Sequence, residues 1–347
     1  MEKNRESLPL DRKVTSRDVA RVAGVSQSTV SRVFSDVSSV KPELKERVYR
    51  AAEEIGYRPN LVARGMISGK TNVIGLVVGD SLGPFYNRII NKFAEAIQKM
   101  GKQCLIFKVP RQDQLGKIVE RVLQFQVEAV IVTASAMTKM MAEVILENNV
   151  PVILFNRFIP GLDISTVYVD AVNGATTVAE YLYQKGHRNI GYIQYIKETG
   201  EELEKKIGFY SKLRQYGIFQ IKEETAEYDY QSGFEAGIRL LSGEDAPSAI
   251  FCTSDLIALG VMDAARKELG LRIPEDVAIV GYDDIEMSSW ESYSLTSVHQ
   301  PVEEMIEKTM EILDNLLKGE KRRDIKMFNP VLKKRNSVSS NMRNGHN

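Results

Sequence analysis

Residues 14–34 read VTSRDVARVAGVSQSTVSRVF, and this stretch predicts two short helices joined by a sharp turn. Thr15, followed three residues later by Asp18, has the pattern of a capped helix N-terminus. Gly24 can adopt the left-handed backbone conformation with which a helix commonly ends, so the chain can turn there. Ser26 can cap the second helix. The apolar stripe of that second helix consists of Val30, Val33 and Phe34.

The polar face of this second helix suits the recognition of DNA bases. It carries Gln27, Ser28, Ser31 and Arg32. Such side chains can donate hydrogen bonds to base edges and phosphates, and the arginine fork matches the two acceptors of guanine. A third helix is expected from Pro42 to Gly56. The alternative is that any small helical bundle has a polar face of this kind towards solvent.

The distribution of charge favours a polyanionic partner for this N-terminal head. Over its 347 residues the chain has 46 basic and 46 acidic residues. Residues 1–70 contain 14 Lys and Arg against 9 Asp and Glu, and the remainder contains 32 against 37. A basic head on an acidic body indicates that the head is the part that meets a polyanion.

From Val73 onward, short β-branched runs alternate with amphipathic helices. The expected strands are Val73–Val78, Gln103–Lys108, Ala129–Thr133, Val152–Phe155, Thr166–Val169, Ile190–Gln194, Ala249–Cys252 and Val277–Val280. The expected helices are Tyr86–Met100, Ala171–Lys185, Glu201–Tyr216, Gln231–Leu241 and Asp255–Leu269. This alternation predicts parallel sheets covered on both faces. The number of strands favours two doubly wound lobes, with a ligand in a cleft between them.

The composition favours a soluble protein of the cytoplasm. No run of about 18 apolar residues is present, and residues 1–13 are polar and charged, unlike a secretory signal. The two cysteines, Cys104 and Cys252, lie in apolar runs and are expected to be reduced thiols.

No pattern of residues predicts catalysis. There is no Gly-x-Gly-x-x-Gly after the first strand, no phosphate-binding loop, no metal-ligand cluster and no Gly-x-Ser-x-Gly. His187, His299 and His346 are not expected to converge, and the pair Asp283 and Asp284 lacks a nucleophile. We therefore expect no enzyme, no catalytic residue, no metal and no cofactor. A doubly wound metabolic enzyme and a solute-binding protein are the less favoured alternatives.

The amino-acid sequence of the head resembles the DNA-binding region of the lactose-repressor/galactose-repressor (LacI/GalR) family of bacterial transcription regulators. The resemblance rests on the stretch Val14–Val33 and on its sequel Tyr57–Arg64, YRPNLVAR. It implies that the helix from Ser26 to Phe34 lies in the major groove. The implied base contacts are Gln27, Ser28 and Arg32, and the implied phosphate contacts are Thr15, Ser26, Thr29 and Ser31. Further implied DNA contacts are Ser16, Tyr57, Asn60, Ala63 and Met66.

The same resemblance implies that the connector becomes a short hinge helix only on operator DNA. The paired hinges of a dimer would enter the minor groove and wedge an apolar side chain there. Met66 stands where the family usually has leucine, and Gly65 before it disfavours a helix.

The body resembles the effector domain of the same family, which is itself similar to periplasmic sugar-binding proteins. The motifs are GHRNIG at 186–191, PEDVAIVGYDD at 274–284 and LTSVHQP at 295–301. The implied effector contacts are Phe85, Tyr86, Asn156, Arg157, Lys205, Tyr228, Ser254, Asp255 and Asp283. Lys205 departs from the pattern, because the family usually has an arginine there. The lysine ammonium group cannot form the bidentate hydrogen bonds to two oxygens that an arginine guanidinium group can form.

The expected domain organisation follows from these patterns and the resemblance together. Residues 1–13 form a disordered tail, 14–57 the helix-turn-helix domain, 58–71 the hinge, 72–336 the two-lobe body and 337–347 a second disordered tail. The first lobe takes in about 72–169 and 300–328, and the second about 170–297 and 329–336.

The fold class is therefore a small all-α helix-turn-helix head plus an α/β body of two doubly wound parallel-sheet lobes of periplasmic-binding-protein type. The expected function is a repressor that binds a palindromic operator as a homodimer, under the control of a small-molecule effector, with no membrane partner. A dimer is favoured because the C-terminal tail has no leucine heptads. The effector is expected to be a sugar. The alternatives are a purine, a nucleoside, a phosphorylated sugar or a protein co-effector.

Overall fold

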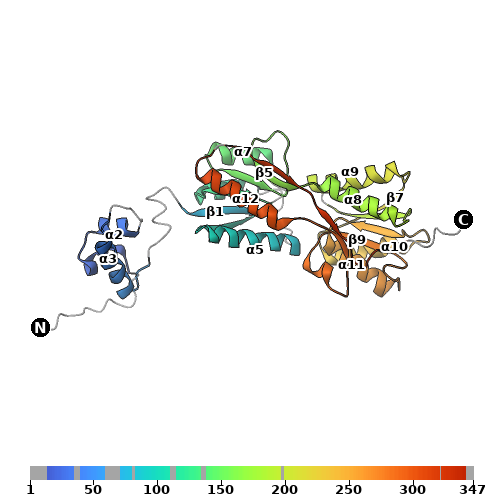
Figure 1. Ribbon diagram of the computed structural model, residues 1–347, viewed down its shortest axis with the longest axis horizontal. Coiled ribbons are helices and arrows are strands. Elements are labelled where there is room, and N and C mark those ends of the chain that lie inside the picture. Colours follow the sequence, from blue (N-terminus) through green and yellow to red (C-terminus); the bar gives the residue numbers. More distant parts are fainter. Residues whose placement is uncertain are drawn as a thin grey trace. The chain divides into compact units, whose positions relative to one another are not determined.

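The computed structural model describes residues 14–34, 40–58, 71–79, 83–109, 115–133, 138–196, 199–320 and 322–340. The chain divides into two compact units, Met1–Asn72 and Val73–Asn347 (Figure 1). The expected tail 1–13, the hinge contacts Asn60, Ala63 and Met66, and residues 341–347 lie outside the described residues.

The N-terminal unit has the expected helices, α1 (Ser16–Ala23), α2 (Gln27–Phe34) and α3 (Pro42–Glu54). Helix α1 begins at the capping box, in which the backbone N–H of Thr15 donates to Asp18 Oδ2 at 3.0 Å. Gly24 ends it with a φ of 62°. The three helices share one small core of apolar side chains. This core consists of Val19, Ala20, Ala23, Val30, Val33, Val48, Ala51 and Ala52.

The body contains two six-stranded sheets within the described residues. The sheet of the first lobe has the order β11-β5-β4-β3-β1-β2 and is parallel throughout. Its strands are β1 (Val73–Val78), β2 (Gln103–Lys108), β3 (Ala129–Val132), β4 (Val152–Phe155), β5 (Ser165–Val169) and β11 (Ile325–Phe328).

The sheet of the second lobe has the order β12-β10-β9-β8-β6-β7, and only its edge strand β12 runs antiparallel to its neighbour among the described strands. Its strands are β6 (Ile190–Tyr195), β7 (Ile221–Ala226), β8 (Ala249–Cys252), β9 (Ala278–Asp283), β10 (Thr296–His299) and β12 (Val331–Lys333). Strands β8 and β9 are buried along their whole length, as expected of central parallel strands.

Helices cover both faces of each sheet. Those of the first lobe are α5 (Pro84–Lys99), α6 (Leu115–Gln124), α7 (Lys139–Glu147) and α12 (Val302–Leu317). Those of the second lobe are α8 (Ala171–Gln184), α9 (Gly200–Gln215), α10 (Tyr230–Leu241) and α11 (Asp255–Asp263). Figure 1 shows α8 and α9 on one side of the second sheet and α10 and α11 on the other. The expected fold class is confirmed.

The described chain passes between the lobes three times. It does so after β5, after β10 and after β11, because each of these strands is followed by an element of the other lobe. One hydrophobic cluster contains apolar side chains of both lobes, including Val78 and Phe85 of the first and Ala226 and Ile285 of the second. The lobes are therefore joined by three segments and by continuous packing.

Two expectations need correction. The helix expected over Asp255–Leu269 is α-helical only to Asp263, and a π-helix, η2 (Ala264–Glu268), continues it. The tail expected to be disordered from residue 337 is ordered at its start. Ser337 donates to the carbonyl of Ile279 at 2.6 Å and accepts from the backbone N–H of Thr296 at 2.8 Å, and Val338 is buried. These hydrogen bonds to buried strands hold the segment in place.

A membrane-spanning helix would need a long apolar stretch, and no helix among the described residues has one.

Helices α10 and α11 approach so closely that Gly260 admits no side chain. A Cβ atom at Gly260 would lie 2.2 Å from the carbonyl oxygen of Tyr230. We expect Gly260→Ala to lower the free energy of unfolding by about 1–3 kcal/mol, because the two helices must move apart. Chemical denaturation measures this change.

Gly243→Ala is the matched control, since nothing lies within 4 Å of its Cβ position. Its unfolding free energy should differ from that of the wild type by less than about 0.5 kcal/mol. Equal stabilities of the two variants would contradict this account of the helix contact.

Candidate DNA-binding and effector sites

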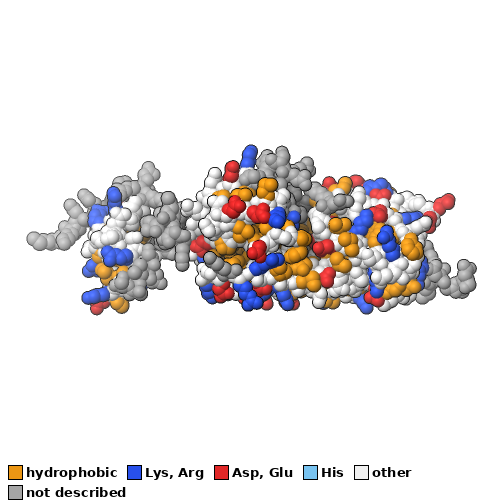
Figure 2. Space-filling model, turned by 90° about the horizontal axis from the view of Figure 1, so that it is seen from above, with side chains coloured by type: hydrophobic (Ala, Val, Ile, Leu, Met, Phe, Trp, Pro, Cys, Tyr) orange, Lys and Arg blue, Asp and Glu red, His pale blue; other side chains and the backbone are white. Residues whose placement is uncertain are grey.

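Helix α2 packs its apolar face against the core of the N-terminal unit and exposes its polar face. Val30 and Val33 are fully buried, whereas Gln27, Ser28 and Arg32 are exposed. Ser28 and Arg32 are four residues apart and share a helix face, as do Gln27 and the exposed Ser31, so these neighbouring pairs form one exposed surface. Figure 2 shows several Lys and Arg side chains on the described surface of this unit. The surface has the groups needed for contact with base edges and phosphates.

Short polar contacts fix the start of α2. The hydroxyl of Ser26 accepts from the backbone N–H of Thr29 at 3.2 Å, as expected of a cap. The amide of Gln27 donates to Ser16 Oγ at 3.1 Å, and Arg17 donates to Gln27 Oε1 at 3.3 Å. Contacts across the first two helices therefore orient the Gln27 side chain.

Tyr57 has a structural role on the same unit. Its ring is half-buried and lies 5.6 Å from the ring of Phe34, centroid to centroid. Phe34 lies 5.4 Å from the ring of Tyr49 on α3. These ring contacts join the end of α2 to α3 and to the segment that follows it.

At the boundary between the lobes, aromatic rings of both lobes pack beside one carboxyl group. Tyr86, at the start of α5, lies 6.4 Å from Tyr228 of the second lobe, centroid to centroid. The hydroxyl of Tyr228 donates to Asp283 Oδ2 at 2.8 Å, and Tyr195 lies 5.9 Å from the Tyr228 ring. A Cβ atom on Gly83 would lie 2.4 Å from the Tyr228 ring, so the glycine permits the close approach of α5.

Asp283 is the central group of this boundary. It ends β9 with a φ of 106°, a left-handed conformation that is strained for a non-glycine residue. Its Oδ1 atom accepts from Gln300 Nε2 at 2.9 Å. Burial raises the pKa of Asp283 well above its usual value, although Lys205 opposes the shift. A strained backbone and a buried carboxyl group with a strongly shifted pKa are typical of a functional residue.

The sequence did not identify Gln300, which lies in the segment crossing between the lobes after β10. It is fully buried, and its Oε1 atom has no hydrogen-bond partner in the described structure. A buried unpaired acceptor costs about 1–3 kcal/mol, so it indicates a missing donor. The signal available in the sequence was an amide directly before Pro301, in the motif LTSVHQP at 295–301.

Asn156 and Arg157 follow β4, as expected. Asn156 has a φ of 55°, is 8% exposed, and neither polar atom of its amide has a partner in the described structure. Burial lowers the pKa of Arg157. The buried Asn156 amide can therefore still both donate and accept hydrogen bonds.

Lys205 is already saturated by groups of its own lobe. Its ammonium group lies 3.0 Å from Glu201 Oε1 and 3.1 Å from Glu202 Oε1, and it donates to the carbonyl of Thr253 at 3.1 Å. It also lies 4.2 Å from the centre of the Tyr282 ring. Burial by itself would lower the pKa of Lys205, but the two glutamates raise it well above its usual value. The lysine is therefore a permanent internal cation.

Three of the expected effector residues have internal roles in the described structure, and their contact with a ligand stays a prediction. Phe85 is 3% exposed and belongs to the apolar core. Ser254 caps α11, where its hydroxyl accepts from the N–H of Ile257 at 3.3 Å. Both oxygens of the fully buried Asp255 accept hydrogen bonds, from Ile285 N–H at 2.8 Å, Ser288 at 2.7 Å and Ser297 at 2.5 Å. Burial raises the pKa of Asp255 to about 7.

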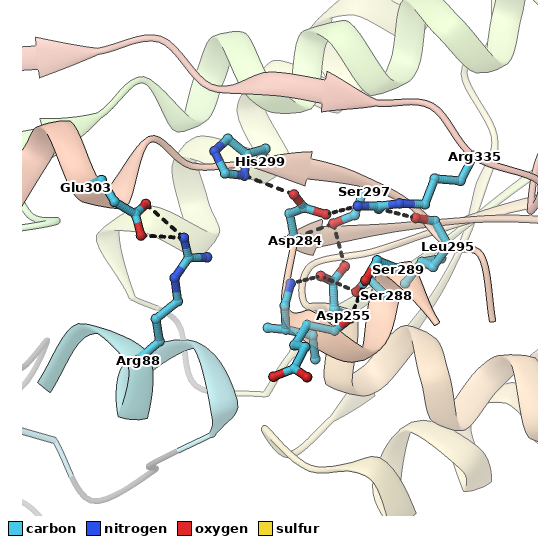
Figure 3. A network of polar contacts seen from close by, with 12 residues as sticks. Arg88, Asp255, Asp284, Ser288, Ser289, Leu295, Ser297, His299, Glu303 and Arg335 are labelled. Carbon is cyan, nitrogen blue, oxygen red and sulfur yellow. Dashed lines mark hydrogen bonds and ion pairs between the residues drawn. The ribbon is translucent and has the colours of Figure 1, made fainter. Parts of the chain in front are cut away.

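A second polar network connects helices, strands and loops near the lobe boundary to one another (Figure 3). Asp284, next to Asp283, accepts from Arg335 at 2.5 Å, and its other oxygen lies 2.9 Å from His299 Nδ1. In the first lobe, Arg88 of α5 donates both of its hydrogen bonds from one nitrogen to Glu303 of α12, each at 2.8 Å. These pairs join elements that are distant in the sequence.

No group of three or more potential metal ligands occurs among the described residues.

The contacts of Asp284 make its contribution to stability dependent on pH. Burial raises its pKa, but the hydrogen bonds from His299 and Arg335 outweigh this and lower the pKa below its usual value. A lowered pKa contributes stability above the unfolded-state pKa of about 4, and this stability is lost as the pH falls further. We expect Asp284→Asn to be less stable than the wild type at pH 7 and the difference to narrow towards pH 3 in urea denaturation.

Asp163→Asn is the matched control, because the Asp163 side chain is 88% exposed and has one ion pair, to Arg323. Its stability should follow that of the wild type at every pH. A difference for Asp284→Asn that stays constant from pH 7 to pH 3 would contradict the assignment.

Comparison with known proteins finds a matching protein family for each of the two units. Residues 15–60 match the family described as "Bacterial regulatory proteins, lacI family", and residues 179–338 match a "Periplasmic binding protein-like domain". The HTH-type transcriptional repressor CytR of Escherichia coli (strain K12) is 30% identical over 309 residues, which are 88% of this chain and 90% of the relative. Catabolite control protein A of Priestia megaterium is 32% identical over 312 residues, with 88% and 93% covered.

Solved structures give the same result. The lac repressor dimer bound to operator and the anti-inducer ONPF is similar with a TM-score of 0.85 and 26% identity, over 94% of this chain and 100% of that one. The complex of the transcriptional regulator CelR with cellobiose has a TM-score of 0.69 and 27% identity, over 93% and 99% of the two chains.

Proposed function

Because the chain belongs to the LacI family of bacterial regulatory proteins, we propose that it represses transcription as a dimer on a palindromic operator. It is a DNA-binding transcription regulator with a small-molecule effector. The observation that carries the proposal is the exposed face of Gln27, Ser28 and Arg32 on a helix whose other face is fixed by Val30 and Val33.

In this proposal α2 enters the major groove. Arg32, Gln27 and Ser28 read base edges, and the hydroxyls near the helix start contact phosphates and set the register. The proposed phosphate contacts are Thr15, Ser16, Ser26, Thr29 and Ser31. Asn60, Ala63 and Met66 are proposed to follow the minor groove between the two half-sites. The phosphate contacts make the affinity fall steeply with salt.

The proposed effector site is the lobe boundary around Asp283. Tyr86 and Tyr228 offer aromatic faces, while Asp283, Gln300 and Asn156 offer polar groups, a combination that suits a sugar-like ligand. Support also comes from CelR, whose structure contains cellobiose. The protein is proposed to act in the cytoplasm and without catalysis.

The proposed switch is a change in the arrangement of the lobes. A ligand at Asp283 contacts the second lobe directly and the first lobe through Tyr86 and the segment containing Gln300. A coupling of about 1–3 kcal/mol between ligand and operator changes operator affinity about 5- to 150-fold. The three crossing segments are the parts that would bend.

Arg32→Ala tests the assignment of the DNA-reading face. We expect the affinity for the tightest-binding palindromic duplex to fall by about 1–3 kcal/mol, because one base contact is lost. Discrimination against a single base change at the contacted position should fall with it. Fluorescence anisotropy at fixed salt measures both quantities.

Arg50→Ala is the matched control, since Arg50 is exposed on α3 and pairs with Glu46 at 2.6 Å. It removes the same charge from the same unit and should leave sequence discrimination unchanged. An Arg32→Ala protein that discriminates as well as the wild type would refute the proposed reading face.

A further inference from the structure

We propose that the effector of this protein carries a positively charged amino group, which Glu201 and Asp283 receive at the lobe boundary beside Tyr86 and Tyr228. This inference rests on the proposed function, because it specifies the ligand class of that same site. It is carried by the polar contacts that remain available there.

The only described lysine in this cluster cannot bind a ligand without losing its present contacts. The ammonium group of Lys205 has three donors, and Glu201, Glu202 and the carbonyl of Thr253 occupy three contacts at 3.0–3.1 Å. Glu202 is also committed, since its second oxygen accepts from the backbone N–H of Tyr195 at 3.2 Å. The lysine and this glutamate therefore form an internal pair.

Around Asp283 and Lys205, two carboxyl groups and one amide of the second lobe and its crossing segment keep acceptor atoms without a donor among the described residues, whereas the other unpartnered buried atoms of this lobe are the hydroxyls of Tyr192, Tyr210 and Tyr282. No described residue donates to the second oxygen of Glu201, whose side chain is 20% exposed. Asp283 accepts two hydrogen bonds, and in its ionised form, which a bound cation favours, a carboxylate has about four acceptor positions. Gln300 Oε1, beside Asp283, is buried without a partner in the described structure. A ligand that fits these groups must bring donors.

The charges favour an ammonium group over neutral hydroxyls. Burial raises the pKa of Tyr86. The nearby carboxyl groups of Glu201, Glu202 and Asp283 raise it further, and a single lysine, Lys205, opposes them. Burial raises the pKa values of Tyr228 and Asp283, and the charge of Glu201 raises both further. These groups therefore lie within electrostatic reach of one another. A buried carboxylate without its own cation is unfavourable, and a bound ammonium group would supply that cation.

The aromatic rings suit the same ligand. Tyr86, Tyr228 and Tyr195 lie in successive edge-to-face contacts of 6.4 Å and 5.9 Å. Organic cations bind favourably against the faces of tyrosine rings, and clusters of such rings recognise ammonium ligands. Arg157, on the first lobe, is a partly buried cation that can pair with an anionic ligand. Binding of an anionic probe is therefore the main alternative outcome of the test.

Two sets of matched probes test the proposal on the full-length protein. The ring set is glucosamine, glucose and glucuronate, and the chain set is 1,4-diaminobutane, 1,4-butanediol and succinate. Within each set the skeleton is kept and the charge changes. Binding is measured by thermal shift and calorimetry, and operator affinity is measured in parallel with no probe present.

We expect the ammonium member of at least one set to bind ten times or more tightly than its neutral and anionic counterparts. Glu201→Gln should weaken that binding at least fivefold, whereas Glu201→Asp, which keeps the charge, should retain the preference for the ammonium probe. Glu244→Gln, the same change at an exposed glutamate of the second lobe, should have no effect. As long as the amine of the probe stays protonated, its affinity should rise with pH, because burial raises the pKa of Asp283 and binding requires its ionised form.

Tighter binding of a neutral or anionic probe, the absence of binding by both ammonium probes, or unchanged binding in Glu201→Gln would each overturn the proposal. None of these results would affect the proposed function if the protein still binds a palindromic operator. Failure of operator binding without probes would instead contradict the proposed function itself.

Discussion

The boundary between the two lobes depends on one buried carboxyl group, that of Asp283. Strand β9 ends there in a strained left-handed conformation, and the side chain accepts from Tyr228 and from Gln300 of a crossing segment. The other lobe reaches the same point through Tyr86 and Gly83. Because each partner belongs to a different part of the fold, the arrangement of the lobes and the environment of this carboxyl group cannot change independently.

The interior around this boundary combines saturated and unsaturated polar groups. Asp255, Asp284 and Lys205 have all their main partners within the protein, so they fix loops and helix ends. Gln300 and Asn156 are buried with polar atoms that lack partners among the described residues. Saturated groups stabilise the fold, whereas buried unsaturated groups cost free energy that a ligand can recover. The contrast separates residues with internal partners from the proposed ligand contacts more sharply than residue type does.

Much of the fold was predictable, because hydrophobic periodicity and capping residues are local properties of the sequence. The head, the strands and the position of Asp283 at the end of β9 follow from such patterns and from the family resemblance. The internal contacts of Phe85 and Asp255 could not be predicted, because burial is decided by tertiary packing, which spacing does not reveal. Gln300 was missed because a single amide in a crossing segment carries no periodic signal. The saturation of Lys205 was readable, since Glu201 and Glu202 precede it by one helical turn.

The central claim is that the exposed face of α2, duplicated in a dimer, reads a two-fold symmetric DNA sequence. Selection from a pool of random duplexes with the full-length protein tests it most directly. The account predicts enrichment of one palindromic site, bound with a stoichiometry of two chains per duplex. Enrichment of no sequence, or of an asymmetric site bound by a single chain, would contradict it.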